Sequence, residues 1–272
     1  MNDALHQIHR SLAAPLSVAE LAKRSSYSSF HFQRLFKAQT GLSINQYIRQ
    51  TRLEWVANLL VFHPNQTIAE LADLCGFQSI ASFSHSFRAY FGVTPKQWRK
   101  NQYQTHVSQA DFQLSPTLRM SEPEVIQLAA QPVIYLRHQG YDQSIRQAWQ
   151  QLAFWQASNK VKTGQMLSLY HSNPLLTPRT ECRYVAALTV ASLEKIPAGV
   201  GRMEIPGGWF LSCRAQGQYG DVLNLWQYLY YQYMPTQALR TLPIPAHGLF
   251  FQNHLSGTQT TFDLALRLPL QI

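Results

Sequence analysis

Residues 17–41 read SVAELAKRSSYSSFHFQRLFKAQTG, and a related stretch returns at residues 67–92 as TIAELADLCGFQSIASFSHSFRAYFG. Each copy opens on a hydroxyl residue, Ser17 or Thr67, with a glutamate three positions later, which is the pattern of a helix-capping box. Each copy then predicts a short helix, a tight break, and a second helix that starts after a serine and ends at a glycine. Two short helices around a tight turn predict a helix-turn-helix, so the sequence predicts two such motifs. A longer apolar helix around residues 44–62 is expected to join them.

The outward face of each second helix carries side chains that suit DNA. Glutamine and arginine can make paired hydrogen bonds to purine edges, and an aromatic ring can contact the thymine methyl group. The second set has fewer long donors, so we expect weaker base readout from it. The alternative is a helical bundle with a solvated polar face, but two copies with matching caps disfavour it. The candidate DNA contacts are Phe30, His31, Gln33, Arg34 and Lys37 in the first copy, and Ala81, Ser82, Ser84, His85 and Arg88 in the second.

The distribution of charge supports a nucleic-acid partner for the first part of the chain. The 272 residues carry a formal net charge of +9, and residues 1–105 hold 11 Lys and Arg against 5 Asp and Glu. A basic chain suits nucleic acid, an anionic membrane or acidic ligands, and charge alone does not choose among them. A polar stretch with two prolines predicts a linker at residues 106–121. The expected domains are therefore residues 1–105 and residues 122–272.

Several other classes of protein are disfavoured by the sequence. The apolar stretches fall short of the roughly 20 residues that a membrane span needs, and the first residues lack the apolar core of a signal peptide. Three distant cysteines favour a reducing compartment, so we expect a soluble cytoplasmic protein without a membrane partner. No catalytic, cofactor or metal constellation is evident, so we expect no cofactor and no enzymatic activity. His6 and His9 lie one helical turn apart without further ligands, which is more typical of exposed surface residues.

The second part of the chain also contains a repeat. Gly140 and Trp149 are separated by the same spacing as Gly217 and Trp226, with a strand-like run before each glycine and an amphipathic pattern after it. We therefore expect an α+β domain of two pseudo-symmetric β-α-β-β units, following an all-α domain with two helix-turn-helix motifs. Such a domain leaves a groove between the two helices and the sheet. The groove candidates, each of which could instead be a core residue, are Tyr141, Trp149, Tyr170, Trp209, Tyr219, Trp226 and Phe250.

The first hundred residues resemble the AraC/XylS family of bacterial transcription regulators. The most specific match is GFQSIASFSHSFRAYFGVTPKQWR at residues 76–99, and the resemblance covers about residues 4–100. It implies two recognition helices in successive major grooves of double-stranded DNA, and contact with RNA polymerase. The base-reading positions that the resemblance implies are Phe30, Gln33 and Arg34, then Ala81, Ser82 and His85.

Residues 122–272 resemble the GyrI-like effector-binding domain. The matching stretches include RHQGYD at residues 137–142, YHSNP at 170–174 and IPGGW at 205–209. The resemblance implies a small, aromatic effector and a role in stress or multidrug responses. Many such domains bind cations through a buried glutamate, and the corresponding position here is Gly248. Without that acid, the sequence predicts a planar, largely uncharged ligand.

Two alternatives remain for the second domain. One is an effector-independent activator whose second domain is a protein-interaction module. The other, less favoured, is a GyrI-like hydrolase that would use Glu204 or Glu181 as its groove carboxylate. Ligand titration distinguishes the first of these from an effector sensor, because a ligand that binds only the folded state raises its stability.

Overall fold

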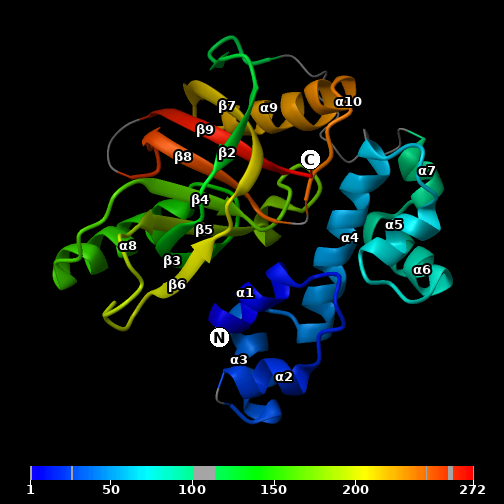
Figure 1. Cartoon of the computed structure of the whole chain (residues 1–272), viewed down its shortest axis with the longest axis horizontal. Helices are drawn as coiled ribbons and strands as arrows, with labels where there is room; N and C mark the ends of the chain where they lie inside the picture. Colours follow the sequence, from blue (N-terminus) through cyan, green and yellow to red (C-terminus); the bar gives the residue numbers. More distant parts are fainter. Residues whose placement is uncertain (1, 26, 101–113, 243, 257–259, 272) are drawn as a thin grey trace. The chain divides into compact units, whose positions relative to one another are not determined.

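The computed structural model describes residues 2–25, 27–100, 114–242, 244–256 and 260–271 (Figure 1). The backbone contacts divide the chain into two units, Met1–Gln109 and Ala110–Ile272. The first is built from helices and the second from an antiparallel sheet with helices. This architecture confirms the predicted fold class, an all-α domain followed by an α+β domain.

Two helix-turn-helix motifs make up most of the first unit. They are formed by the second and third helices and by the fifth and sixth, and the long fourth helix joins them as predicted. The elements are α1 (Asn2–Arg10), α2 (Val18–Arg24), α3 (Ser29–Thr40), α4 (Ile44–Phe62), α5 (Ile68–Leu74), α6 (Ile80–Phe91) and α7 (Pro95–Arg99).

Local capping sets the ends of the paired helices. The hydroxyl of Thr67 accepts from the backbone N–H of Glu70, whose side chain accepts from the backbone of Thr67, which completes a capping box. Ser28 and Ser79 cap α3 and α6 in the same way, each accepting a backbone N–H three residues on. At the other end Gly92 adopts a left-handed conformation with φ of 74°, which an L side chain rarely takes. The caps therefore place the two motifs where the sequence indicated.

Aromatic side chains anchor the inner face of each second helix. Phe32 and Phe36 of α3 are fully buried in a cluster with residues of α1 and α4. In the second motif the ring of Phe87 packs against Trp98, with centroids 5.6 Å apart, and the indole of Trp98 donates to the carbonyl of Ala57 at 3.0 Å. Burial of a large aromatic side chain contributes about 1.5–3 kcal/mol, so these anchors fix which face each helix turns outward.

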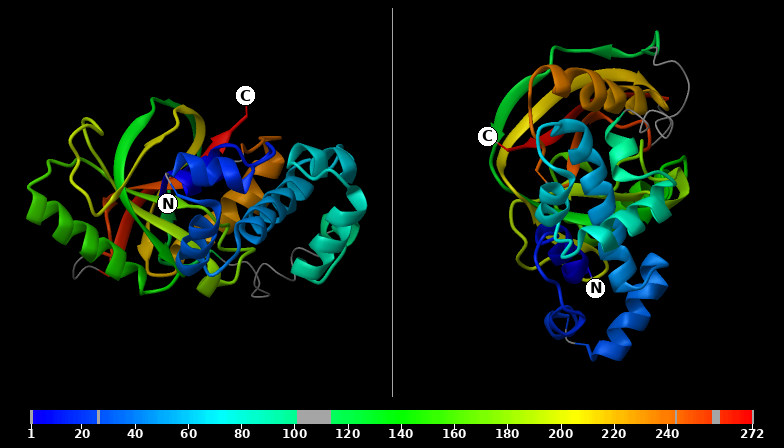
Figure 2. Two further views of the ribbon diagram at one scale, coloured as in Figure 1. Left: turned by 90° about the horizontal axis from the view of Figure 1, so that it is seen from below. Right: turned by 90° about the vertical axis from the view of Figure 1, so that its right-hand side faces the viewer.

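The second unit is a nine-stranded antiparallel sheet in which the strand order is β1-β7-β9-β8-β4-β5-β3-β6, with β2 also paired to β7. The long strands bend, and the sheet is visibly curved in both views of Figure 2. The strands are β1 (Arg119–Met120), β2 (Glu124–Leu128), β3 (Gln131–Gln139), β4 (Met166–Tyr170), β5 (Arg183–Thr189), β6 (Gly201–Ile205), β7 (Gly208–Gln218), β8 (Ala246–Gln252) and β9 (Thr261–Leu270). The main helices are α8 (Ile145–Asn159), α9 (Asp221–Gln227) and α10 (Met234–Thr236), and a π-helical turn, Tyr228–Tyr233, lies between the last two.

Two β-α-β-β units form the centre of this sheet, as predicted. One is β3-α8-β4-β5 and the other is β7-α9-β8-β9; in each, the last strand pairs with both of the others. The units join where β4 pairs with β8, with Ser168 opposite Gly248. Trp149 of α8 packs on Phe250 of β8, and Trp226 of α9 packs on Tyr170 of β4. The two helices therefore cover the same face of the sheet.

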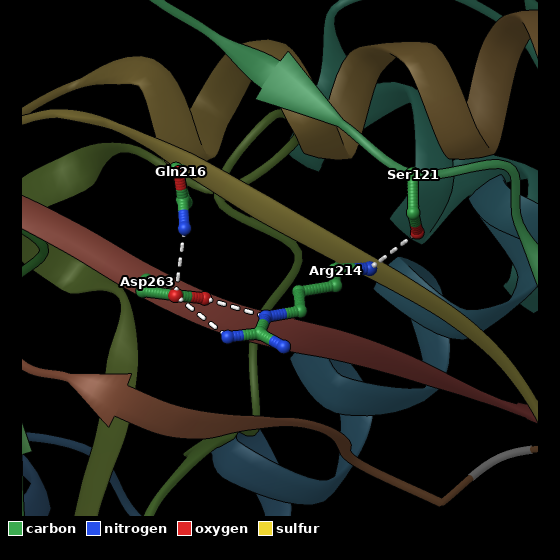
Figure 3. A network of polar contacts seen from close by, with 4 residues as sticks. All are labelled: Ser121, Arg214, Gln216 and Asp263. Carbon is green, nitrogen blue, oxygen red and sulfur yellow. Dashed lines mark hydrogen bonds and ion pairs between the residues drawn. The ribbon is translucent and has the colours of Figure 1, made fainter.

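A polar network lies on the opposite face of the second unit (Figure 3). Arg214 of β7 donates twice to the carboxylate of Asp263 on β9, at 2.9 and 2.8 Å, and Gln216 donates to the same carboxylate. The backbone N–H of Arg214 donates to the hydroxyl of Ser121, and its guanidinium lies 4.2 Å from the ring centre of Phe251. Because the Arg214 side chain is exposed to solvent, the ion pair is screened and stabilises the unit only weakly, although it links the neighbouring strands β7 and β9.

Candidate nucleic-acid interface and ligand pocket

The outward face of α3 (Figure 1) presents the predicted contacts of the first motif. Phe30 is 80% exposed, so its ring does not contribute to the core and is available to a partner. Gln33, Arg34 and Lys37 are also exposed. His31 is partly buried, with its ring 5.2 Å from that of Tyr27. Gln33, Arg34 and Lys37 thus lie on one surface of α3. This surface faces away from the core because Phe32 and Phe36 on the other side of the helix are buried.

The outward face of α6 carries shorter side chains. Ala81, Ser82, His85 and Arg88 are exposed and Ser84 is partly buried. The two motifs therefore have the same backbone arrangement, but most of the exposed side chains of α6 are shorter than those of α3. This agrees with the sequence, in which the second set has fewer long hydrogen-bond donors.

A polar groove lies between the two motifs, and α4 forms its floor. Its lining includes Ser17, Arg49, Arg52, Gln78 and Ser82. Arg49 is exposed there, so its charge is available to an anionic partner between the two second helices. Sequence reasoning missed this residue because it lies on the joining helix and not on a helix-turn-helix.

Arg52 of α4 is bound to backbone on both sides of this groove. It donates to the carbonyls of Leu12 and Ala14 before α2 and to the carbonyl of Gly76 between α5 and α6, each at 2.8 Å. Burial lowers the pKa of Arg52, and the nearby Cys75 opposes that change. The Arg52 guanidinium therefore stabilises the fold of the first unit and is not an exposed contact for DNA.

A small, partly open pocket of about 40 Å³ lies in the second unit, on the helix-covered face where the two β-α-β-β units meet. Four of the seven sequence candidates line it, and they come from both units. Its lining comprises Tyr141, Asp142, Ile145, Tyr170, Arg179, Tyr184, Tyr219, Gly220, Val222, Leu223, Phe250, His254 and Leu255.

The three tryptophan candidates are not among the lining residues. Trp149 is buried behind the pocket, where its indole donates to the hydroxyl of Tyr184 at 3.1 Å. Trp226 is buried and stacks on Tyr230, with ring centres 5.1 Å apart. Trp209 is 40% exposed on β7. The first two therefore support the pocket wall from the core.

The pocket wall is mostly apolar, and several of its polar groups are neutral tyrosine hydroxyls and an imidazole. Burial raises the pKa values of Tyr141, Tyr170 and Tyr184, so their hydroxyls stay protonated. Burial, and then the charge of Arg146, lower the pKa of His254 to about 4, which keeps its imidazole neutral at pH 7. The Nδ1 atom of His254 is buried without a hydrogen-bond partner in the described structure. These groups can donate or accept hydrogen bonds without contributing charge.

His254 and Arg179 were also missed from the sequence. Arg179 begins a short 3-10 turn, Arg179–Glu181, and His254 lies in the connection after β8. Connections show no periodic pattern, so only their place beside Tyr141 and Tyr219 identifies them.

Gly248 stands where the sequence comparison expected an acid. A Cβ atom built there would lie 2.7 Å from the Ser168 hydroxyl oxygen and 3.4 Å from that of Tyr170. The position thus faces a side chain that lines the pocket, and it carries no carboxylate. Glu181 and Glu204, the carboxylates considered for a hydrolase, are exposed and are not among the pocket's described lining residues.

The expectation that His9 is an exposed surface residue is wrong. His9 is buried, and its Nε2 atom lies 2.8 Å from the hydroxyl of Tyr47, because α1 turns this face toward α4. The side chain of His6 lies outside the described residues. Within the described part of the chain no group of three potential metal ligands occurs, and the three cysteines are buried with no disulfide between them. No helix there is long and apolar enough to cross a membrane.

Duplicated helix-turn-helix motifs with polar outward faces, followed by an α+β unit with an aromatic pocket, define a DNA-binding regulator that carries a small-molecule-binding domain. Comparison with family models agrees: residues 21–101 match a helix-turn-helix domain, and residues 121–271 match the GyrI-like small molecule binding domain. The chain belongs to the AraC/XylS family of transcription regulators and carries a GyrI-like domain after its DNA-binding domain.

Several proteins similar to this chain are named as transcription regulators, and others as antibiotic resistance proteins. The multiple antibiotic resistance protein MarA of Escherichia coli is 36% identical over 104 residues, which are 38% of this chain and 81% of MarA. The transcriptional activator RhaR of Pectobacterium carotovorum is 35% identical over 96 residues, 35% of this chain and 34% of RhaR. Among solved structures, an AraC-type transcriptional regulator from Chromobacterium violaceum has 29% identity and a TM-score of 0.34, covering 36% of this chain and 86% of its own.

Proposed function

We propose that α3 and α6 read a specific double-stranded DNA site, with α3 contributing most of the base recognition. The observation that carries this proposal is the outward face of α3, where Gln33 and Arg34 are exposed opposite the buried Phe32 and Phe36. Both side chains can make paired hydrogen bonds to purine edges in the major groove. His31, Lys37, Ser84, His85 and Arg88 complete the proposed contact surface, together with Phe30, Ala81 and Ser82.

Duplex binding by the full chain tests this proposal. Affinity should fall with salt at a log–log slope of about −0.9 per phosphate contacted, because phosphate contacts release counterions. A labelled operator should also resist competition by unrelated duplexes of the same length. Equal competition by every duplex would contradict specific recognition.

We further propose that the pocket of the second unit binds a small aromatic effector that alters regulation, as in a stress or multidrug response. Support comes from the exposed or lining aromatics Tyr141, Tyr219 and Phe250 and from the core tryptophans behind them. An aromatic library should raise the melting temperature of the full chain in a concentration-dependent way. Val222→Trp would fill the pocket and should abolish that shift while the DNA affinity remains.

The remaining parts of the proposal follow from this reading. We place the DNA-binding domain at residues 1–105, the linker at 106–121 and the effector domain at 122–272. The chain acts in the cytoplasm without catalysing a reaction and contacts RNA polymerase once bound to DNA.

In the alternative, the second domain is a protein-interaction module. Phe154, which is 75% exposed on α8, favours that reading. Substitution of Phe154 by Ser would then abolish activation without changing any ligand shift.

A further inference from the structure

The charged groups around the pocket are mostly cationic. Arg179 lines the pocket, and Arg146 follows Ile145, which also lines it. Burial and then the negative charge of Asp142 raise the pKa of Tyr219, whereas the charges of Arg179 and Arg146 lower it, so one carboxylate and two guanidinium groups act on the same hydroxyl. Arg146 also acts on His254. Two positive charges and one negative charge therefore act on the side of the pocket that holds Tyr219 and His254, which leaves an excess of one positive charge.

The one acidic residue among the described lining residues is already engaged. Asp142 accepts the backbone N–H of Ser144 at 2.8 Å, and hydrogen bonds from Ser144 lower the pKa of its carboxyl. Its carboxylate thus stabilises the turn that precedes α8. No second carboxylate balances the two arginines, because Gly248 has no side chain and the tyrosine hydroxyls remain protonated.

This balance decides which charge a buried ligand can carry. A cation would lose its hydration and find, among the described lining residues, only the carboxylate of Asp142 against two guanidinium groups, a cost that aromatic contacts recover only in part. A carboxylate would instead receive charge-assisted hydrogen bonds from guanidinium groups, which are among the strongest in proteins. The neutral hydroxyl of Tyr219 and the imidazole of His254 could donate to the same oxygens.

We propose that the pocket takes an aromatic organic acid, with its ring among Tyr141, Tyr170 and Phe250 and its carboxylate facing Arg179 and Arg146. The proposal rests on the proposed function of this pocket as the effector site. It replaces the largely uncharged ligand expected from the sequence by an anionic one, because the sequence expectation did not take Arg179 and Arg146 into account.

Three probes that share one ring system test the charge preference in the full chain. They are 2-naphthoate, neutral 2-naphthamide and the cation 2-naphthylmethylammonium, each titrated by calorimetry at pH 7. We expect 2-naphthoate to bind about tenfold more tightly than the amide, and the cation more weakly than both. The advantage of the acid should shrink as salt rises, since ion pairs at a pocket rim are screened.

Arginine variants locate the charge effect. Arg179→Gln should weaken 2-naphthoate about fivefold or more and leave 2-naphthamide within about twofold, since only the ion pair is lost. Arg146→Gln is a second variant with the same expectation. Arg240→Gln is the matched control. The Arg240 side chain is exposed, and its backbone carbonyl accepts the N–H of Gln271, which follows the last residue of β9. The pocket residue His254 instead precedes the first residue of β9. Arg240 therefore lies at the opposite end of this strand from His254. This control should leave all three affinities unchanged.

The outcomes separate this proposal from the function on which it rests. If the amide or the ammonium probe binds as tightly as the acid, and Val222→Trp blocks binding, the pocket is an effector site but not one for acids. If no probe binds, both the proposed pocket function and the acid preference are contradicted. An equal loss of all three probes in both arginine variants, with melting curves unchanged, would also overturn the ion-pair assignment.

Discussion

The guanidinium of Arg52 donates from Nη1 to the carbonyl oxygen of Gly76 at 2.8 Å, which ties the joining helix α4 to the turn of the second helix-turn-helix. Its other two nitrogens bind the carbonyls of Leu12 and Ala14, which precede the first motif. One side chain thus fixes backbone on both sides of the groove between the motifs. Because α3 and α6 belong to different motifs, the spacing of their outward faces depends on this contact.

Removal of the Arg52 guanidinium should loosen both motifs at once. Arg52→Ala removes the donor to two partly buried carbonyls and one exposed carbonyl, so we expect a loss of roughly 1–3 kcal/mol in the free energy of unfolding. Arg52→Lys should be intermediate, because an ammonium lacks the planar fork of donors. Urea unfolding measures both effects.

DNA binding distinguishes a positioning role for Arg52 from simple destabilisation. At a temperature where the variants remain folded, Arg52→Lys should weaken binding to a complete site more than binding to the half that α3 contacts. Equal weakening of the complete site and the half-site would contradict a role in spacing the two motifs.

Gly76 should tolerate substitution less well than Gly92, although both have positive φ. At Gly92, φ is 74° and nothing lies within 4 Å of an added Cβ, so Gly92→Ala should cost only the left-handed strain of about 1–2 kcal/mol. At Gly76, φ is 83° and an added Cβ would lie 2.5 Å from the carbonyl oxygen of Ala13. Gly76→Ala should therefore cost clearly more in chemical denaturation. Similar costs at the two glycines would show that the segment before α2 can move aside.

The helical unit was largely predictable because its determinants are local. Ser28 and Ser79 cap helices that begin one residue later, and glycines end them, so short windows of sequence contain the signal. Arg52 was not predictable in the same way. Its partners Leu12 and Gly76 are 40 and 24 residues away, and no periodicity links a cation to distant carbonyls.

The second unit shows a similar limit. Matching glycine and tryptophan spacings predicted two β-α-β-β units, but strand β6 and the short strands β1 and β2 were not expected. The same spacing left Trp149 and Trp226 as either groove or core residues, and the helices turn both indoles into the core. Helical periodicity identifies an apolar face, but it does not tell whether that face meets a pocket or a sheet.

The two outward helix faces should contribute unequally to base recognition. Arg34→Ala or Gln33→Ala should cost about 1–3 kcal/mol on the preferred site and relax the base preference at one position, because a paired hydrogen bond is lost. Ser82→Ala should cost less, since the serine side chain is short. A base-substitution scan of the site with each variant measures both effects. The ranking is wrong if Ser82→Ala proves the more damaging change.

His254 should make the second unit sensitive to acid. The folded state binds a proton at this imidazole only near pH 4, whereas the unfolded chain binds one near the usual pKa of about 6.5. The contribution of His254 to the free energy of unfolding is therefore fully present above pH 6.5 and is lost as the pH falls toward 4. The loss is at most about 1.4 kcal/mol per pH unit. His254→Phe keeps a ring against Phe250 and Phe262 but removes the titration. Urea unfolding of the full chain between pH 4 and 8 should give parallel curves for wild type and variant above pH 6.5, and a shallower acid loss for the variant below it. Identical slopes below pH 6.5 would mean that the imidazole is hydrated enough in the folded state to protonate at its usual pKa.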